Sequence, residues 1–461
     1  MFLDHRYKKK HWNKVIHTTF NPKGPGVIRI HMIPPKQSAG SHAPAVVILN
    51  GQELLPLNES WAILLTEFIE QVNAHGPGEI SDAEMDGILT RTYKGVKKVY
   101  PNVPIRYLEE DLDTIIQVFE AIINQDELPI EVGAMNIGQY APKMKAPHRM
   151  DLMVSAMEQN GHWNCNQQCV HCYAAGQPLS NQQELSTEKW KQIIDKCQKA
   201  MIPQLTFTGG EPTMRDDLPE LIYAARWFVT RLNTNGIRLT PEYCEDLVRA
   251  ELDSVQVTFY SCDREIHNTL VGGNHFDQTV QGIKNALAAG LNLSANTPLC
   301  TLNKEYVKTL EFLYDLGVTY VTCSGLIISG NATKEQSVST RLDKQEMKDI
   351  LKEATEYCYT HGMEINFTSP GWVDGASLNA IGLDAPICGA CLSNMAITPN
   401  GKVVPCQSYL SEKPLGDMLK SEWQQIWNSQ PCRTMRKESA KMQETCPLYE
   451  KNANASKEVE A

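Results

Sequence analysis

The chain has 461 residues, of which 42% are hydrophobic and 21% charged, and its formal net charge is −11. This length allows two or three domains with buried cores, and the composition is typical of a globular protein rather than a fibrous or disordered one. The negative charge argues against general nucleic-acid binding, no apolar run is long enough to span a membrane, and the basic start lacks the apolar centre of a signal peptide, so we expect a cytoplasmic protein.

Residues 1–130 are expected to form one small α+β domain. Asn58 and Ser81 are candidate N-caps, because each precedes a segment with helical spacing of apolar residues. Strands followed by three helices suggest a winged-helix-like module, and the proline-containing stretch 131–148 is interpreted as a linker. The predicted elements are strands at 26–34 and 43–51 and helices at 57–73, 81–93 and 108–124.

From residue 149 the pattern changes to alternating strands and helices. Such alternation implies parallel strands joined by right-handed crossovers, and six or seven units predict an α/β fold with a partial (β/α)6-type TIM barrel over residues 149–375. A small C-terminal iron–sulfur domain is expected at 376–450, followed by a disordered tail at 451–461. The predicted barrel strands are 149–157, 204–210, 227–234, 253–261, 291–299, 319–328 and 364–370.

The motif CNQQCVHC places Cys165, Cys169 and Cys172 in the loop after the first predicted barrel strand. A structural zinc site or a closed iron–sulfur cluster usually takes four protein ligands, and no fourth cysteine lies nearby. Three thiolates could hold three irons of a cubane and leave the fourth iron open to an outside ligand. A zinc site completed by His162 or His171 is the alternative that the spacing leaves open.

A second motif, TFTGGEPTM at 206–214, follows the second predicted strand. Gly209 and Gly210 would let the backbone approach a ligand closely, because a side chain would prevent that approach. Pro212 fixes the turn, and Glu211 offers an acceptor for a ligand's ammonium group.

The cysteine loop followed one strand–helix unit later by GGEP resembles the radical S-adenosylmethionine (SAM) superfamily. In that family SAM chelates the open iron of a [4Fe-4S] cluster, and its reductive cleavage gives a 5′-deoxyadenosyl radical that removes a substrate hydrogen. The family often has an aromatic residue where this chain has His171. Ordinary sheet hydrogen bonding is the alternative role for Thr258 and Asn296. The SAM contacts that the resemblance implies are Gly209, Gly210, Glu211, Pro212, Tyr173, Asn235, Thr258 and Asn296.

Residues 388–406 contain the pattern Cys391-x9-Gly401-x4-Cys406, with a hairpin predicted at the Asn400–Gly401 turn. This pattern resembles the SPASM or twitch extension, which carries auxiliary iron–sulfur clusters, and a helix is expected at 416–427. The dense cysteine run of a full SPASM region is missing, and a zinc ribbon is the alternative. The implied ligands of one auxiliary [4Fe-4S] cluster are Cys388, Cys391, Cys406 and Cys446, with Cys432 as the alternate fourth ligand.

The N-terminal module resembles the peptide-recognition (RRE-like) element of peptide-modifying enzymes, which accepts a leader peptide as an added strand. A plain helical cap or a dimerisation domain is the alternative for this module. The resemblance implies an enzyme that matures a ribosomally made precursor peptide, for example by a crosslink or thioether, with flavodoxin or ferredoxin as the reducing partner. The alternatives are a radical SAM enzyme acting on a tetrapyrrole or cofactor precursor, and a non-catalytic iron–sulfur or zinc scaffold. For an acid–base group the sequence offers only Cys262 and Cys323, for which a buried structural thiol is the alternative.

Overall fold

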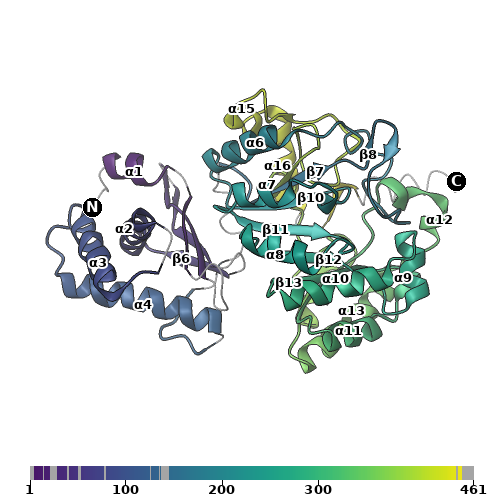
Figure 1. The fold of residues 1–461 in the computed structure, drawn as a ribbon, viewed down its shortest axis with the longest axis horizontal. Coiled ribbons are helices and arrows are strands. Elements are labelled where there is room, and N and C mark those ends of the chain that lie inside the picture. The colour runs from purple at the N-terminus through teal and green to yellow at the C-terminus, as the bar shows by residue number, and fades with distance from the viewer. Residues whose placement is uncertain are drawn as a thin grey trace. The chain divides into compact units, whose positions relative to one another are not determined.

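The computed structural model describes residues 5–13, 15–20, 28–38, 41–49, 53–76, 79–124, 126–133, 135, 145–442 and 445–448. Two compact units are formed, one by Met1–His148 with Asp195–Gln204 and Trp227–Val229, the other by Arg149–Ile194, Leu205–Arg226 and Thr230–Ala461 (Figure 1). The predicted tail at 451–461 and much of the predicted linker lie outside the described residues. None of the described helices is both long and apolar enough to cross a membrane.

The first unit is built on an antiparallel sheet with the strand order β1-β2-β5-β6. The predicted N-caps are confirmed: Asn58 accepts a hydrogen bond from the Trp61 backbone N–H at 2.9 Å, and Ser81 forms a capping box with Glu84. Two predicted strands and three predicted helices are present, and β1, β6 and the short β3–β4 hairpin were not predicted. The elements are α1 (His5–His11), β1 (Ile16–Phe20), β2 (Ile28–Ile33), β3 (Lys36–Ser38), β4 (Ser41–Ala43), β5 (Ala45–Leu49), β6 (Glu53–Leu57), α2 (Glu59–His75), α3 (Asp82–Val96) and α4 (Ile105–Asn124).

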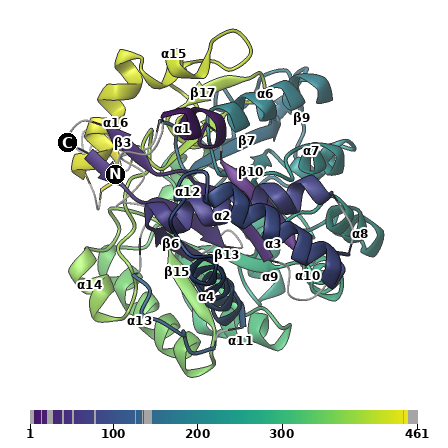
Figure 2. The same ribbon diagram turned by 90° about the vertical axis from the view of Figure 1, so that its left-hand side faces the viewer.

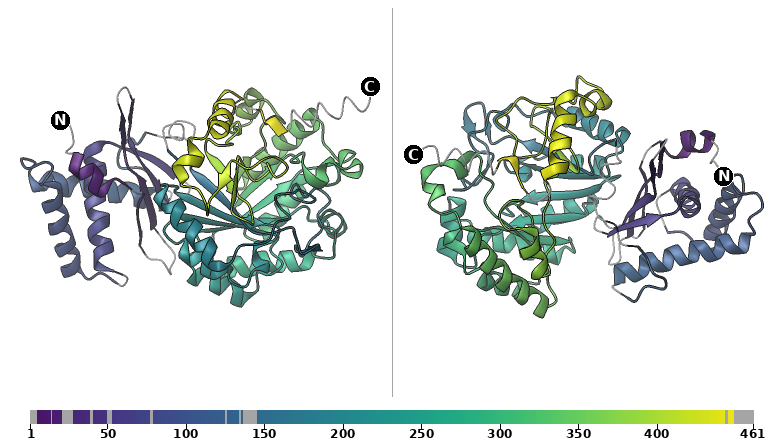
Figure 3. Two further views of the ribbon diagram at one scale, coloured as in Figure 1. Left: turned by 90° about the horizontal axis from the view of Figure 1, so that it is seen from above. Right: turned by 180° about the vertical axis from the view of Figure 1, so that it is seen from behind.

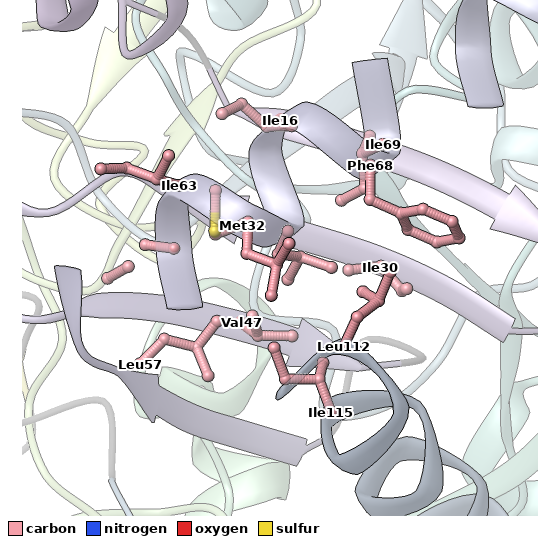
Figure 4. Packing of buried hydrophobic residues seen from close by; sticks show 14 of the residues in the cluster. Ile16, Ile30, Met32, Val47, Leu57, Ile63, Phe68, Ile69, Leu112 and Ile115 are labelled. Atoms are coloured by element: carbon pink, nitrogen blue, oxygen red, sulfur yellow. The ribbon is translucent and has the colours of Figure 1, made fainter. Parts of the chain in front are cut away.

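Helices α2, α3 and α4 lie on one side of this sheet (Figure 3). Alternate strand residues such as Ile30, Met32 and Val47 point to that side, as the two-residue period of a strand requires. They pack against Phe68 of α2 and Leu112 of α4 in one buried cluster (Figure 4). Burial of this apolar surface is what stabilises the unit.

The second unit contains the predicted strand–helix repeats. Its strands run in the order β15-β14-β13-β12-β11-β10-β7 and continue to β16-β17-β18, so β15 and β7 are not neighbours and the barrel stays partial. Neighbouring strands from β11 to β15 are parallel, as predicted. The barrel strands are β7 (Arg149–Ser155), β10 (Gln204–Gly209), β11 (Val229–Thr234), β12 (Ser254–Thr258), β13 (Leu293–Pro298), β14 (Tyr320–Ser324) and β15 (Glu364–Phe367).

Helices α6, α7, α8, α10, α11 and α13 follow one another around the outside of these strands (Figure 2). This arrangement leaves the carboxyl ends of the strands and their following loops to carry the functional groups. The helices are α6 (Thr187–Lys199), α7 (Leu218–Ala224), α8 (Pro241–Arg249), α9 (Arg264–Val271), α10 (Phe276–Ala288), α11 (Tyr306–Asp315), α12 (Glu335–Val338), α13 (Lys344–Thr360) and α14 (Gly375–Ala380).

The C-terminal segment extends the barrel sheet, because β16 (Asn394–Ile397) pairs in parallel with β7. The predicted hairpin is confirmed by the antiparallel pairing of β16 with β17 (Lys402–Val404). The helix predicted at 416–427 is shorter: Gly416–Asp417 forms β18, and α15 covers only Trp423–Trp427. Pairing of β18 with β17, with Asp417 Oδ2 2.7 Å from Lys402 Nζ, takes these residues into the sheet. Helix α16 (Gln430–Met442) follows.

Candidate functional site

The three cysteines of the first motif converge in the loop that follows β7 and the small hairpin β8 (Glu158–Gln159) and β9 (His162–Trp163). Burial, with smaller contributions from the nearby Glu211 and Cys172, raises the pKa of Cys165 to about 12. Burial also raises the pKa of Cys169, as do the adjacent Cys172 and Cys165. Three half-buried thiols close to one another resist ionisation, so bound cations are needed to hold them as thiolates.

This donor set, three sulfurs on one loop, fits an iron–sulfur cluster, which takes one thiolate per iron. Over the described residues no three His, Cys, Asp or Glu side chains lie close enough to share one metal ion. His171, considered above as a zinc ligand, places its Nε2 atom 2.7 Å from Thr340 Oγ1, and burial lowers its pKa to about 4.

A distant segment holds the cysteine loop in place. The Asn331 side-chain amide donates to the carbonyl of Cys169 at 3.1 Å, and its backbone N–H donates to the carbonyl of Cys172 at 2.9 Å. The Ser337 hydroxyl donates to the Val170 carbonyl at 3.0 Å. These residues lie in the 3-10 helix η4 (Gly330–Thr333) and in α12, and the sequence analysis missed them because they form no motif.

Gly330 is the one sequence signal that could have pointed to this segment. Its φ is +57°, and an added Cβ would lie 2.4 Å from the Tyr173 carbonyl oxygen and 2.6 Å from that of Cys172. Only glycine allows this close approach to the cysteine loop.

The two glycines of GGEP have a packing role in the structure. At Gly209, with φ +138°, an added Cβ would lie 2.3 Å from the Ser155 carbonyl oxygen, and at Gly210 it would lie 2.6 Å from that of Ala156. The observed close approach is therefore to the backbone at the end of β7. A close approach to SAM stays a prediction.

Glu211 is 2% exposed, and its carboxylate is satisfied within the protein. Oε1 accepts hydrogen bonds from the hydroxyls of Thr213 at 2.6 Å and Thr234 at 2.7 Å, and Oε2 accepts from the Asn235 backbone N–H at 2.8 Å. Burial raises its pKa, while these hydrogen bonds oppose the rise. In the structure Glu211 joins the loop after β10 to the loop after β11, and direct acceptance from an ammonium group stays a prediction. Pro212 begins the short 3-10 helix η2 (Pro212–Met214).

The remaining predicted SAM contacts lie on the barrel strands or beside the cysteine loop. Asn235 donates its side-chain amide to Asn166 Oδ1 at 2.6 Å. Thr258 pairs with Asn296 across β12 and β13, and Asn296 Oδ1 accepts a hydrogen bond from Thr322 at 2.8 Å. The Tyr173 hydroxyl donates to Gln407 Oε1 at 3.3 Å.

The two candidate acid–base cysteines do not share one location. Cys323 is fully buried and follows Thr322, whose hydroxyl bonds Asn296, so Cys323 points to the opposite face of β14. Burial raises the pKa of Cys323, and nearby Cys358 of α13 adds to this rise. Cys323 therefore does not lie on the side of the sheet that carries Asn296. Cys262 lies in the loop after β12, where its backbone N–H donates to Thr309 Oγ1 at 3.2 Å.

The second cysteine group forms around Cys406. Burial, with smaller contributions from the neighbouring Cys446 and Cys388, raises the pKa of Cys406 to about 12. Cys391 has a positive φ of +55° and is hydrogen-bonded to Cys432. All five predicted auxiliary ligands thus lie in one region, with Cys388 and Cys446 beside Cys406 and with Cys391 beside Cys432.

Arg436 stabilises the Cys391 side of this group. Its Nε donates to the Cys391 carbonyl at 2.9 Å, its Nη2 lies 3.2 Å from Cys432 Sγ, and its guanidinium carbon lies 3.5 Å from the Trp427 ring centroid. The hydrogen bond with Cys391 lowers the pKa of Cys432, and the positive charge of Arg436 contributes to this lowering.

Comparisons with known proteins agree with this arrangement. A family model of the radical SAM superfamily matches residues 164–314, and a model of the SPASM iron–sulfur cluster-binding domain matches residues 388–448. Fe-coproporphyrin III synthase of Methanosarcina barkeri is 31% identical over 212 residues, which are 43% of this chain and 52% of that protein. PqqA peptide cyclase of Streptomyces rochei is 24% identical over 292 residues, 61% of this chain and 78% of the cyclase.

The chain therefore spans about half the length of the first of these relatives and about three quarters of the second. Among solved structures, Streptococcus suis SuiB bound to its precursor peptide SuiA has a similar fold, with a TM-score of 0.56 and 14% identity over 85% of this chain and 87% of SuiB. The motifs, the partial barrel and both family matches lead to one conclusion. Residues 164–314 form a radical SAM domain, and residues 388–448 form a SPASM iron–sulfur cluster-binding domain.

Proposed function

We propose that this protein is an enzyme that modifies a ribosomally made precursor peptide by radical SAM chemistry. In this proposal Cys165, Cys169 and Cys172 hold the SAM-binding [4Fe-4S] cluster. With cluster and SAM bound, and with an electron from a flavodoxin- or ferredoxin-type partner, the site supplies the radical that removes a substrate hydrogen. The convergence of three half-buried thiols near Glu211 is the observation that carries this reaction class.

The chain's own residues would fix the geometry of the cysteine loop. Glu211 accepts from Asn235, and Asn235 donates to Asn166, which lies between the first two cysteines. Asn331 holds the other end of the loop through the carbonyls of Cys169 and Cys172. Loops fixed from both ends position a reacting group precisely and exclude water, two requirements of a reactive intermediate.

For the second cluster we propose Cys388, Cys391, Cys406 and Cys446 as ligands, with Cys432 as the alternate. Cys406 supports this set because its thiol lies beside those of Cys388 and Cys446. We also propose the domain limits as 1–130 for peptide recognition, 131–148 for a linker, 149–375 for the barrel and 376–450 for the auxiliary-cluster domain.

The peptide substrate is supported by the first unit. The fold similarity to SuiB covers 85% of this chain, more than residues 149–461 account for, so it includes part of that unit. Strand β6 ends the sheet next to α2 and would accept a leader peptide by strand addition. At the other edge the His17 carbonyl of β1 already accepts a hydrogen bond from the Asn73 side chain at 2.8 Å, which favours β6.

A surface cavity of about 940 Å³ between α3 and α4 offers further room for leader side chains. Leu89 and Tyr93 of α3 and Leu112 and Ile116 of α4 line it with apolar surface. A peptide that crosses this surface would bury those side chains, which would add to its affinity.

A tetrapyrrole substrate is the second candidate. The relative with 31% identity is named Fe-coproporphyrin III synthase, and its match covers 43% of this chain. A tetrapyrrole enzyme would give no role to the edge strand and cavity of the first unit.

The test uses the full-length, anaerobically reconstituted protein with SAM and dithionite. One arm supplies a short peptide encoded beside this chain's gene, with and without its leader, and the other supplies coproporphyrin III. We expect the mass of the peptide to change. We also expect the leader to lower the KM for the peptide by about tenfold or more, because tethering raises the local concentration of the modified segment. Turnover of coproporphyrin III with an unmodified peptide would contradict the proposal.

A further inference from the structure

The inner side of the barrel sheet carries a positive charge that has no ion-pair partner among the described residues. Arg231 lies on β11, and its side chain alternates with the fully buried Leu232, so the two point to opposite faces of the sheet. Its Nε donates to Ser254 Oγ at 3.4 Å, and no salt bridge or further hydrogen bond from its guanidinium joins it to the described chain.

The carboxylate near Arg231 already has a partner. Asp151 is 1% exposed, and its Oδ1 lies 2.9 Å from Nε of Arg149. Arg231 also interacts electrostatically with both groups: Arg149 repels it and Asp151 attracts it. Two guanidinium groups and one carboxylate leave an excess positive charge. Buried charges are normally paired, so the excess positive charge favours the binding of an anion.

The side chains around Arg231 are polar and share its face of the sheet. Strand register places Arg231 beside Ser254 and Asn233 beside Gln256, and the buried Oδ1 of Asn233 has no hydrogen-bond partner in the described structure. Asp151 lies on β7, and the loop that carries the three cysteines follows this strand. This inner surface therefore connects Arg231 to the neighbourhood of the cysteine loop.

We propose that Arg231 binds a carboxylate of the substrate inside the partial barrel. The inference rests on the proposed function and deepens it, because it predicts an acidic group next to the modified position. A guanidinium holds a carboxylate through two parallel N–H···O bonds, and both Nη groups of Arg231 remain available for them. The carboxylate comes from a Glu or Asp side chain of a peptide, or from a propionate if the substrate is a tetrapyrrole.

Binding is measured on the full-length reconstituted protein with two probe pairs. The first pair is the blocked tripeptide Ala-Glu-Ala and its neutral counterpart Ala-Gln-Ala, and the second is coproporphyrin III and its tetramethyl ester. We expect the carboxylate member of at least one pair to bind about tenfold or more tightly than its neutral counterpart, the usual gain from a charge-assisted hydrogen bond. Arg231→Gln should remove this preference, and Arg231→Lys should keep part of it because the charge remains.

Arg249→Gln is the matched control, since it removes an equal charge from an exposed position on α8. It should keep the full preference. A preference for the tripeptide supports both the carboxylate site and a peptide substrate, whereas a preference for the porphyrin alone supports the site and contradicts the peptide. If neither pair shows a preference, or if Arg231→Gln leaves it unchanged, the carboxylate site is wrong whether or not a precursor peptide is modified. If Arg231→Gln weakens SAM binding instead, the carboxylate belongs to SAM and the proposal is also wrong.

Discussion

Asn235 donates its side-chain amide to Asn166 Oδ1 across 2.6 Å, and this bond connects two loops that are 69 residues apart in sequence. The backbone N–H of Asn235 also donates to Glu211. One residue thus connects the loop after β11 with both the GGEP loop and the cysteine loop. The relative position of the two motifs depends on it.

We therefore expect Asn235→Ala to weaken SAM binding while the core cluster still assembles. Loss of one hydrogen bond costs about 1 kcal/mol, which corresponds to about a fivefold rise in the Kd of SAM. Iron content and SAM affinity are measured on the same reconstituted samples. Asn379→Ala, at an exposed position in α14, is the control. An unchanged Kd for the Asn235 variant would show that the connection is not needed for SAM binding.

Gly330 provides a test of the segment that holds the cysteine loop. Gly330→Ala would place a Cβ 2.4 Å from the Tyr173 carbonyl oxygen, so either the loop or the segment must move. We expect less iron in the reconstituted protein and a slower SAM cleavage.

Gly290→Ala is a matched control for this variant. Gly290 also has a positive φ, +75°, but an added Cβ there would meet nothing within 4 Å. Both variants carry the backbone cost of a left-handed alanine, roughly 1–2 kcal/mol. Equal loss of iron in the two variants would mean that backbone strain, and not contact with the cysteine loop, is responsible.

The auxiliary ligands can be separated by iron counting. With two [4Fe-4S] clusters the wild-type protein should bind about eight irons. Cys446→Ser should retain about four, because Cys446 lies with Cys388 beside Cys406. Cys432→Ser should still bind about eight irons, since the Cys432 thiol is hydrogen-bonded to Cys391 and Arg436. The reverse result would make Cys432 the fourth ligand.

His267 should make stability depend on pH below neutrality. It is fully buried in α9, its Nδ1 accepts from the Tyr260 backbone N–H at 3.4 Å, and burial lowers its pKa to about 4. In the unfolded chain His267 binds a proton as the pH falls through about 6.5, whereas in the folded chain it stays neutral at that pH. Its contribution to the free energy of unfolding is therefore complete above that pH and is lost as the pH falls toward 4. The resulting loss in the free energy of unfolding can reach about 3 kcal/mol.

The measurement is the free energy of unfolding of wild type and His267→Gln at pH 7 and pH 5. The variant should lose less stability on acidification than the wild type does. His361→Gln removes a histidine from an exposed position at the end of α13 and should behave like the wild type. If His267→Gln shows the wild-type pH dependence, other groups cause it.

Much of the fold could be predicted because its signals are local. Asn58 and Ser81 begin helices through hydrogen bonds to residues three positions later, and Asn400–Gly401 closes a hairpin between adjacent strands. The seven predicted barrel strands follow from short apolar runs that alternate with amphipathic helices. β18 was missed because it exists only through its pairing with β17.

The candidate site was predictable only as far as its motifs extend. The cysteine and GGEP spacings can be read directly, but Asn331 reaches Cys169 from 162 residues away and forms no motif. Burial cannot be read from a motif either, so Glu211 was predicted as a ligand acceptor although three protein residues hydrogen-bond its carboxylate. Arg231 was missed for the same reason, since only strand register shows which face it occupies.

The most direct test of radical SAM chemistry in this chain is the formation of 5′-deoxyadenosine from SAM and dithionite. The anaerobically reconstituted wild-type protein should produce it. Cys165→Ala, Cys169→Ala and Cys172→Ala should each abolish it, because each thiolate is expected to hold one iron. Cys197→Ala, which removes a fully buried thiol from α6, is the control and should retain activity. Production of 5′-deoxyadenosine at the wild-type rate by the three single variants would contradict the assignment of the core cluster.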